Sequence, residues 1–399
     1  GLGSDEGWQM RAHIIGQLLG FDFSASPHLK GVLNDAEQLR NRGLMYLEEY
    51  FQSVSAVMPT VVFLEDIHWA DDSSLDAVNR LGRSASQQRL MFVCAARPSL
   101  FERRPYWGEG LAYHYRLALE PLSKRQSGLL IDEILKLVEQ IPPDLRQLVL
   151  RGAEGNPFYI EELIKMLVED GVIITGEERW LVEPDRLAQV EVPTTLTGVL
   201  QARLDSLPLE ERQVLQQASV VGRIFWDDAV RCMSAESVTP TKLNTPYNTD
   251  EDLISLRARE LIYRREESAF AGTNEYTFKH AVLRDVTYES VLKRLRKAYH
   301  GLVADWLIEH SAERLAEYAG LIAEHLLLAG RSEQALIYLR IAGESALVSY
   351  ANPEAESYFR RALDLAATEE ERAVLMSGLG EALSRQGFSD EALQTWRKA

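Results

Sequence analysis

The chain has 399 residues, 46% of them hydrophobic and 26% charged, which is enough to bury cores in roughly two to four domains. A formal net charge of −17 argues against wholesale binding to nucleic acid or to an anionic membrane. Cys94 and Cys232 match no disulfide or zinc spacing, and the longest apolar runs are shorter than the ~18 residues of a membrane span. We therefore expect a cytoplasmic protein without a membrane partner.

The first third of the chain alternates helical and strand patterns. Helices are expected at about 9–19, at about 35–53 and after Asp71-Asp72, one of which is a natural N-cap, and strands at 60–64, 90–95 and 112–119. Strand, helix, strand is the unit of a parallel sheet.

The strand expected at 60–64 ends in two adjacent acids, Glu65 and Asp66. Ligands bind beyond the carboxyl ends of parallel strands, where a carboxylate pair can hold hydrated Mg²⁺ and orient a water. This is the Walker B arrangement of phosphate-loop NTPases. Its partner, a Gly-x-x-x-x-Gly-Lys-[Ser/Thr] loop, cannot be drawn, because Gly-Lys occurs nowhere in the sequence.

Residues 123–169 have a helical period that is broken at Pro142-Pro143 and at Gly155-Asn156-Pro157, where Pro157 marks a helix start. Residues 170–193 read as an irregular connection. Helices near 195–206, 209–220 and 250–260 then precede two strand-like runs, 261–267 and 275–280. Three helices followed by a hairpin are the outline of a winged helix.

The region after about residue 316 is helical and internally similar. Segments 335–342, 355–362 and 392–399 share small residues at their ends, a large residue at the fifth place and Arg at the sixth. Small residues at fixed spacing let neighbouring helices approach, and the later segments fall at the offsets of a tetratricopeptide (TPR) pattern. The array is irregular, and we expect it to be truncated.

Five motifs together resemble one family. They are Leu64–Asp72 (LEDIHWADD), Ala95–Pro98 (AARP), Leu119–Ser123 (LEPLS), Glu154–Leu163 (EGNPFYIEEL) and Phe278–Asp285 (FKHAVLRD). The chain resembles the AAA-16/STAND class of signalling ATPases, in particular bacterial regulators whose ATPase module follows a class III adenylate or guanylate cyclase domain. The resemblance covers nearly the whole chain.

The resemblance implies a role for individual residues. Glu65 and Asp66 match the Walker B acids, one holding Mg²⁺ and the other orienting the attacking water, with the assignment between them open. Arg97 matches a sensor of the γ-phosphate. Pro157 matches the helical lid that packs on the nucleotide, and His280 matches a histidine that contacts the β-phosphate of ADP, although Ala281 replaces the acid that often follows.

Each of these residues also has a purely structural interpretation. The acids could cap the next helix, Arg97 could pair with one of them, Pro157 could only start a helix, and His280 could be a core histidine. We interpret His68 and Trp69 as packed residues. We interpret the basic run Lys293–Lys297 as a solvated helix end that complements the helix dipole rather than a nucleic-acid patch.

The resemblance predicts a multidomain fold. We expect a partial α/β P-loop NTPase core at 1–123, a helical lid and connection at 124–193, a winged helix at 194–300 and truncated α-helical TPR-like repeats at 301–399. In the family the phosphate loop and its strand precede this region, and that strand lies between the strands at Leu90 and Ala112. We therefore expect a parallel sheet that lacks its first strand, in a fragment or a degenerate relative, and poor binding of ATP.

The leading hypothesis is a STAND-type nucleotide switch that uses ATP/ADP and Mg²⁺ when the phosphate loop is present. The full-length protein would be an ATPase, and this chain would be inactive alone. Its partners would be a protein bound by the repeats, an upstream effector domain in cis and further copies on activation. The alternative is a non-catalytic interaction scaffold with a degenerate ATPase fold. A winged-helix transcription factor is a third reading, which the acidic balance disfavours.

Overall fold

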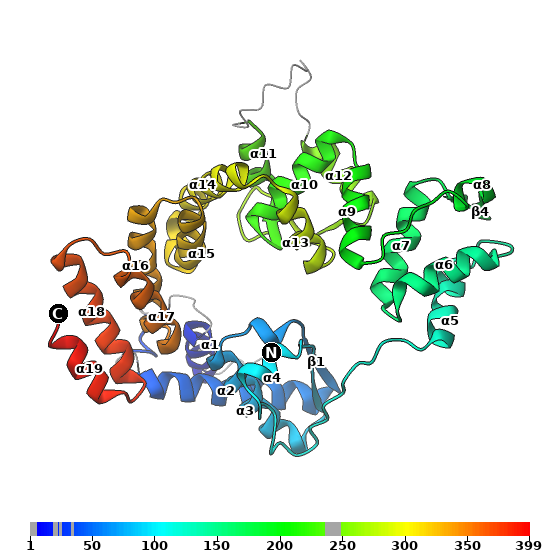
Figure 1. Ribbon diagram of the computed structural model, residues 1–399. Coiled ribbons are helices and arrows are strands. Elements are labelled where there is room, and N and C mark those ends of the chain that lie inside the picture. Colours follow the sequence, from blue (N-terminus) through cyan, green and yellow to red (C-terminus); the bar gives the residue numbers. More distant parts are fainter. Residues whose placement is uncertain (1–5, 19–22, 24–25, 33–35, 236–248) are drawn as a thin grey trace. The chain divides into compact units, whose positions relative to one another are not determined.

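A computed structural model describes residues 6–18, 23, 26–32, 36–235 and 249–399. The chain divides into two compact units (Figure 1). The first holds residues 1–117, 314–323 and 332–399, and the second holds 118–313 and 324–331. Helix α15 (Leu315–Leu328) therefore contributes to both units. In the described ranges, no helix has the length and apolarity that crossing a membrane requires.

The first unit begins with an α/β segment. Its elements are α1 (Glu6–Leu18), α2 (Ala36–Val57), β1 (Thr60–Leu64), η1 (Ile67–Trp69), α3 (Asp72–Ser84), η2 (Ala85–Gln87), β2 (Leu90–Cys94) and α4 (Ser99–Arg103). β1 and β2 pair in parallel, from Thr60 opposite Leu90 to Leu64 opposite Cys94. Asp71 caps α3, because its side chain accepts a hydrogen bond from the Ser74 amide at 2.7 Å. The strands at 60–64 and 90–95 and the capped helix between them are confirmed.

One face of the β1–β2 pair is apolar and exposed. Phe51 of α2 packs edge-on against Phe92 of β2, with ring centroids 5.8 Å apart. Val61, Phe63 and Met91, in contrast, are 63%, 57% and 59% exposed. Parallel sheets are normally covered on both faces. Within the part of the chain that the structure describes, no element buries these three apolar side chains.

The prediction of a strand at 112–119 is wrong. These residues run as turn and coil, and the side chains of Tyr115, Leu117 and Leu119 are 87%, 81% and 88% exposed. The alternation of residue types is suitable for a strand, but a strand is held by the ladder of hydrogen bonds to a neighbour. Among the described residues, β2 pairs with β1 and with no other strand.

Four helices, α16 (Ser332–Val348), α17 (Asn352–Leu363), α18 (Glu369–Arg385) and α19 (Ser389–Trp396), end the first unit, each packed against the next. Ala355, Ala362 and Ala392 are fully buried, as expected of small residues where helices approach closely. Phe359 is 1% exposed, and a Cβ added at Gly343 or Gly378 would come within 2.9 or 2.5 Å of its ring. The helices and their close packing through small residues are confirmed.

The second unit begins with three helices around one core, α5 (Lys124–Ile134), α6 (Pro143–Ala153) and α7 (Pro157–Glu169). The two predicted breaks lie at the starts of α6 and α7. The segment after α7 is more ordered than expected, because β3 (Ile173–Ile174) and β4 (Leu181–Val182) form an antiparallel pair and α8 (Pro184–Leu187) follows. Such short elements produce no readable period in the sequence.

The rest of the second unit combines helices with a small sheet. Its elements are α9 (Leu196–Ser206), α10 (Leu209–Val221), β5 (Ile224–Trp226), α11 (Asp227–Ala235), α12 (Thr249–Ala258), β6 (Ile262–Arg264), β7 (Glu275–Phe278), α13 (Ala281–Ser290), α14 (Lys293–His310) and η3 (Ala312–Arg314). The sheet is antiparallel in the order β5-β7-β6. The three expected helices and the hairpin are present, whereas β5 and α11 were not predicted.

One local expectation is reversed. The basic run at 293–297 begins α14 and does not end a helix, so it lies at the unfavourable end of the helix dipole. Arg296 compensates in part through an ion pair with Glu289, at 2.9 Å.

Candidate functional site

The carboxylates at the end of β1 lie at the edge where both parallel strands finish. Glu65 follows the last residue of β1, and the Ala95 amide after β2 donates to the Leu64 carbonyl at 2.8 Å. The Glu65 side chain is exposed, and Asp66 adopts a left-handed conformation with φ of 54°. A non-glycine residue in this region is uncommon and costs free energy, although Asp tolerates it better than most residues. The turn at Asp66 starts η1 directly after the strand.

Arg97 lies at the same edge, three residues beyond β2, with an exposed side chain. Its amide faces Nδ1 of His68 at 3.5 Å, which is the outer limit of a hydrogen bond. His68 is buried, and its Nε2 has no hydrogen-bond partner among the described residues. The structure therefore brings Glu65, Asp66 and Arg97 to one sheet edge and gives His68 the packed position expected of it. The same expectation is wrong for Trp69, which is 58% exposed.

The donor set at this edge is compatible with magnesium chemistry. Mg²⁺ takes oxygen ligands, keeps several waters and is commonly held by one or two carboxylates together with substrate phosphates. Glu65 and Asp66 supply such oxygens on successive residues. No cluster of three or more His, Cys, Asp and Glu side chains suited to a metal ion occurs in the described ranges. Two carboxylates alone would make a weak site, which a phosphate group would have to complete.

Pro157 starts α7 behind a tight turn. Glu154 and Gly155 both have positive φ, and the Asn156 side chain accepts hydrogen bonds from the amides of Phe158 and Tyr159 at 3.0 and 3.3 Å. A Cβ added at Gly155 would lie 2.3 Å from the Leu122 carbonyl oxygen. Only glycine therefore fits this turn, which fixes the start of α7.

His280 occupies the N-cap position of α13 without a capping hydrogen bond from its side chain, and it lies beside the start of α7. Its ring is stacked at a tilt on Phe158, with centroids 3.8 Å apart. Burial and the nearby cations Lys279, Lys165 and Arg223 lower the pKa of His280 to about 4, so the ring is neutral at pH 7. Its Nε2 is buried without a hydrogen-bond partner in the described part of the chain. The structure thus places a neutral, incompletely satisfied imidazole in a positive environment.

Ion pairs between α7 and the elements that follow it were not foreseen from the sequence. Arg203 of α9 is 1% exposed and binds Glu169 at 2.6 Å, Glu162 and the Arg259 carbonyl. At the surface, Glu260 accepts hydrogen bonds from Lys165 of α7 and from Lys279, and these lower the pKa of Glu260 to about 2. Glu162 and Arg203 are 41 residues apart in sequence.

The five residues expected at the site fall into two groups. Glu65, Asp66 and Arg97 belong to the first unit, whereas Pro157 and His280 belong to the second, where Phe158 links them.

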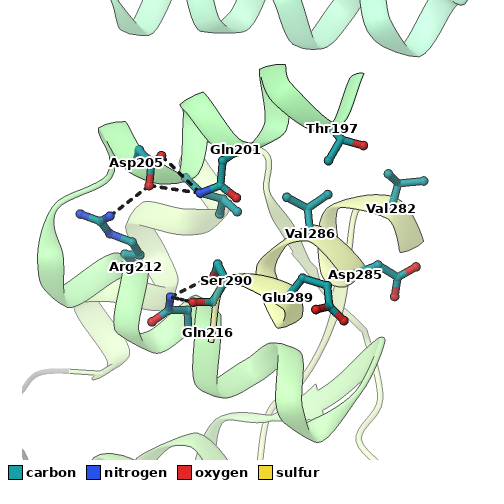
Figure 2. Close-up of a pocket in the computed structure, with 11 residues that line it drawn as sticks. Thr197, Gln201, Asp205, Arg212, Gln216, Val282, Asp285, Val286, Glu289 and Ser290 are labelled. Carbon is teal, nitrogen blue, oxygen red and sulfur yellow. Dashed lines mark hydrogen bonds and ion pairs between the residues drawn. The ribbon is translucent and has the colours of Figure 1, made fainter. Parts of the chain in front are cut away.

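A cavity of about 490 Å³ lies elsewhere in the second unit, between α9, α10 and α13 (Figure 2). None of the five expected residues lines it. Its apolar lining includes Val282 and Val286, and its charged groups are compensated, since Asp205 pairs with Arg212 at 3.2 Å and Glu289 with Arg296 at 2.9 Å. Asp285 also lines the cavity and pairs with Arg284 at 3.3 Å. Because Arg284 and Arg296 are not among the lining residues, the lining itself carries three carboxylates and one guanidinium.

Comparisons with known proteins concern parts of larger chains. Residues 123–178, which span α5 to α7 and β3, match a domain family described as "Domain of unknown function (DUF8739)". An uncharacterized protein of Rhizobium meliloti (strain 1021), R02095, is 26% identical over 343 residues, which are 83% of this chain and 30% of that protein. The chain thus spans under a third of the length of this curated relative.

Among solved structures, the fold is similar to that of a Signal Transduction ATPase with Numerous Domains (STAND) protein with a tetratricopeptide repeat sensor, PH0952 from Pyrococcus horikoshii. The TM-score is 0.50 at 13% identity, and the match covers 100% of this chain and 57% of that one. The Aeropyrum pernix ORC1 protein in complex with DNA matches at a TM-score of 0.26 and 14% identity, over 70% of this chain and 73% of that chain, which is too low to bear on the fold. At this identity the match shows a likeness of fold alone, between this chain and part of PH0952.

Proposed function

We propose that the chain is the regulatory part of a STAND-type nucleotide switch, fused in the full-length protein to an effector such as a nucleotide cyclase. The observation that supports this most is the fold likeness over the whole chain, together with two acids and an arginine at one edge of a parallel strand pair. In this proposal, residues 1–123 are a partial NTPase core, 124–193 the lid and connection, 194–300 a winged helix and 301–399 TPR-like repeats.

In the proposed switch, Glu65 and Asp66 hold Mg²⁺ and orient the attacking water, and Arg97 senses the γ-phosphate. Pro157 and Phe158 at the start of α7 pack on the nucleotide, and His280 contacts the β-phosphate of ADP. Bound ADP locks a closed form. A protein signal on the repeats opens it, ATP replaces ADP, and the change is relayed to the effector or to further copies of the chain.

The neutral state of His280 shapes its proposed role. A neutral imidazole offers a hydrogen bond rather than a charge, while Lys279 and Lys165 supply the positive field. An anion bound beside His280 favours the protonated ring. A bound phosphate is therefore expected to raise the pKa of His280 from about 4, and the imidazole then takes up a proton. Histidine NMR titration of the full-length protein with and without ADP measures this. An unmoved His280 in the presence of saturating ADP would count against the contact.

The phosphate cradle is the part that this chain does not supply. Among the described residues the parallel sheet has only β1 and β2, which supports a core whose sheet is completed at its edges by further strands that carry a phosphate loop. We expect the chain alone to bind Mg-ATP poorly, because backbone amides and a lysine around the phosphates are needed for tight binding. Micromolar binding of Mg-ATP by the purified chain would refute this.

The test of the acids uses full-length protein. Asp66→Ala is expected to slow hydrolysis more than it weakens ATP binding, because the acid acts on the attacking water or its metal. Asp71→Ala is the matched control, because it removes the N-cap of α3 and leaves Glu65 and Asp66 unchanged. Equal loss of binding and hydrolysis in Asp66→Ala would contradict the assigned role.

A second candidate is a non-catalytic scaffold, in which α16 to α19 bind a protein partner and the ATPase fold is inactive. The absence of Gly-Lys from the sequence favours it. A phosphate loop encoded directly upstream of this region would decide for the switch. A DNA-binding role for the second unit predicts salt-sensitive duplex binding, which the net charge of −17 disfavours.

A further inference from the structure

A buried chain of hydrogen bonds joins three helices of the second unit. The Tyr288 hydroxyl of α13 lies 2.9 Å from Nε2 of His300 in α14, and Nδ1 of His300 lies 2.8 Å from Nδ1 of His325 in α15. The His325 ring also hydrogen-bonds the backbone of Val221, at the end of α10. His300 and His325 are 2% and 4% exposed, so water does not share these bonds.

The partners fix where the protons lie. The Val221 carbonyl can only accept, so His325 carries its proton on the nitrogen that faces it, Nε2 in our assignment. Nδ1 of His325 must then accept from Nδ1–H of His300, whose Nε2 in turn accepts from the Tyr288 hydroxyl. Every ring nitrogen is satisfied when both histidines are neutral. Once both rings are protonated, two N–H groups face each other across 2.8 Å.

The surroundings oppose a second proton. The charged groups that act on the pair are Arg284 of α13 and Arg296 of α14, whose guanidinium carbons lie 4.7 and 4.6 Å from the Tyr288 ring centre. Arg284 also donates to the Ser219 carbonyl of α10 at 2.8 Å, which holds its guanidinium against that helix. On α15, Glu324 is exposed. A buried imidazolium would therefore face two cations without a buried counter-ion among the groups that act on it.

We propose that the His300–His325 pair is a proton-sensitive latch, which holds the end of α15 against α10, α13 and α14 while both rings are neutral and releases it when acid adds a proton. Because α15 contributes to both units, opening the latch would free this helix from the second unit. The latch is independent of the nucleotide chemistry proposed above.

The sign and size of the effect follow from the proton affinities. Burial lowers the pKa of His300 from 6.5 to about 4 and that of His325 to about 3. The open form therefore binds more protons than the closed form. The latch is at full strength above pH 6.5 and weakens as the pH falls from 6.5 toward 4. If one ring alone takes up a proton, the opening constant rises about 30-fold between pH 7.5 and pH 5.

The test is hydrogen–deuterium exchange of the peptide that covers residues 324–331, corrected for the intrinsic pH dependence of exchange. In the intact chain we expect its opening constant to rise about 30-fold or more between pH 7.5 and pH 5. In His325→Gln this acid response should be smaller, because His300 is then the only ring of the pair that takes up a proton on opening. An intact chain with no acid response, or a His325→Gln variant with an undiminished one, would overturn the latch.

Two further variants keep the test decisive. His280→Gln removes another histidine of lowered pKa from the same unit, outside the latch, and should leave the response intact; loss of the response there would assign it to His280 and refute the proposal. Tyr288→Phe removes one hydroxyl and serves if His325→Gln does not fold. Without that donor to the neutral ring, the pKa of His300 in the closed form should rise, so the acid response should level off at a higher pH and be smaller in total. An unchanged response in Tyr288→Phe would contradict the proton assignment.

Discussion

The buried arginine of α9 gives the sharpest test of how the second unit is held together. In Arg203→Met the side chain keeps its approximate length but loses every hydrogen bond, which leaves Glu162 and Glu169 without their principal partner. Glu162 is 2% exposed, so water cannot easily replace the guanidinium. Lys165 offers little compensation, since its Nζ lies 3.7 Å from Glu162.

The expected size comes from the cost of an uncompensated buried charge. Removing one partner of a buried ion pair typically destabilises by about 3–5 kcal/mol, whereas breaking an exposed pair costs less than about 1 kcal/mol. Arg212→Met is the matched control, because Arg212 pairs with Asp205 at 3.2 Å and both are substantially exposed. Converted to an opening constant, the loss in Arg203→Met is about 150-fold to about 5000-fold.

Native-state hydrogen exchange of peptides from α7 and α9 measures this opening directly and avoids assuming that a chain of two units unfolds in one step. The faster exchange should be confined to the second unit. An opening constant for Arg203→Met within a factor of five of that for Arg212→Met would show that the pair contributes no more than a surface contact, and the reasoning would fail.

Two other substitutions test close packing, each beside a matched control. Gly155→Ala should destabilise α7 by more than about 1 kcal/mol, because its new Cβ would meet the Leu122 carbonyl and its φ is +83°. Gly272 has a φ of +82° and open space around it, so Gly272→Ala measures the cost of the backbone conformation alone. Equal losses of stability in thermal unfolding of the two variants would show that the contact with Leu122 contributes nothing. Phe359→Ala should lower the free energy of unfolding of the repeats by about 3–5 kcal/mol. Phe388 is 51% exposed, so Phe388→Ala should lower it far less. Similar urea midpoints for the two variants would show that Phe359 is not the centre of that core.

Elements with a local signal could be predicted from the sequence. Asn156-Pro157 marked the start of α7 because both residues act within one turn, and β1 and β2 were recognisable as short unbroken apolar runs. Segment 112–119 had the alternation of a strand, but a strand depends on a neighbour that its own residues do not encode. β5 was missed because it has only three residues and, unlike β6, it does not pair with the strand that follows it in sequence.

The candidate site was predictable only in part, for the same reason. Adjacent acids after an apolar strand placed Glu65 and Asp66 at the sheet edge, and the parallel register brings Arg97 to the same edge. The contacts that set the state of His280 and Arg203 come from residues far along the chain, such as Phe158 and Glu162. A single sequence carries no period or spacing that pairs such residues, so those contacts required coordinates.

The uncovered apolar face of β1–β2 has a practical consequence for anyone who prepares this polypeptide. Val61, Phe63 and Met91 form an exposed apolar patch, and in the described ranges the outer edges of β1 and β2 are unpaired. Such surfaces promote self-association. The apparent molar mass from light scattering should rise with protein concentration. Replacing these three residues with lysine should prevent that rise.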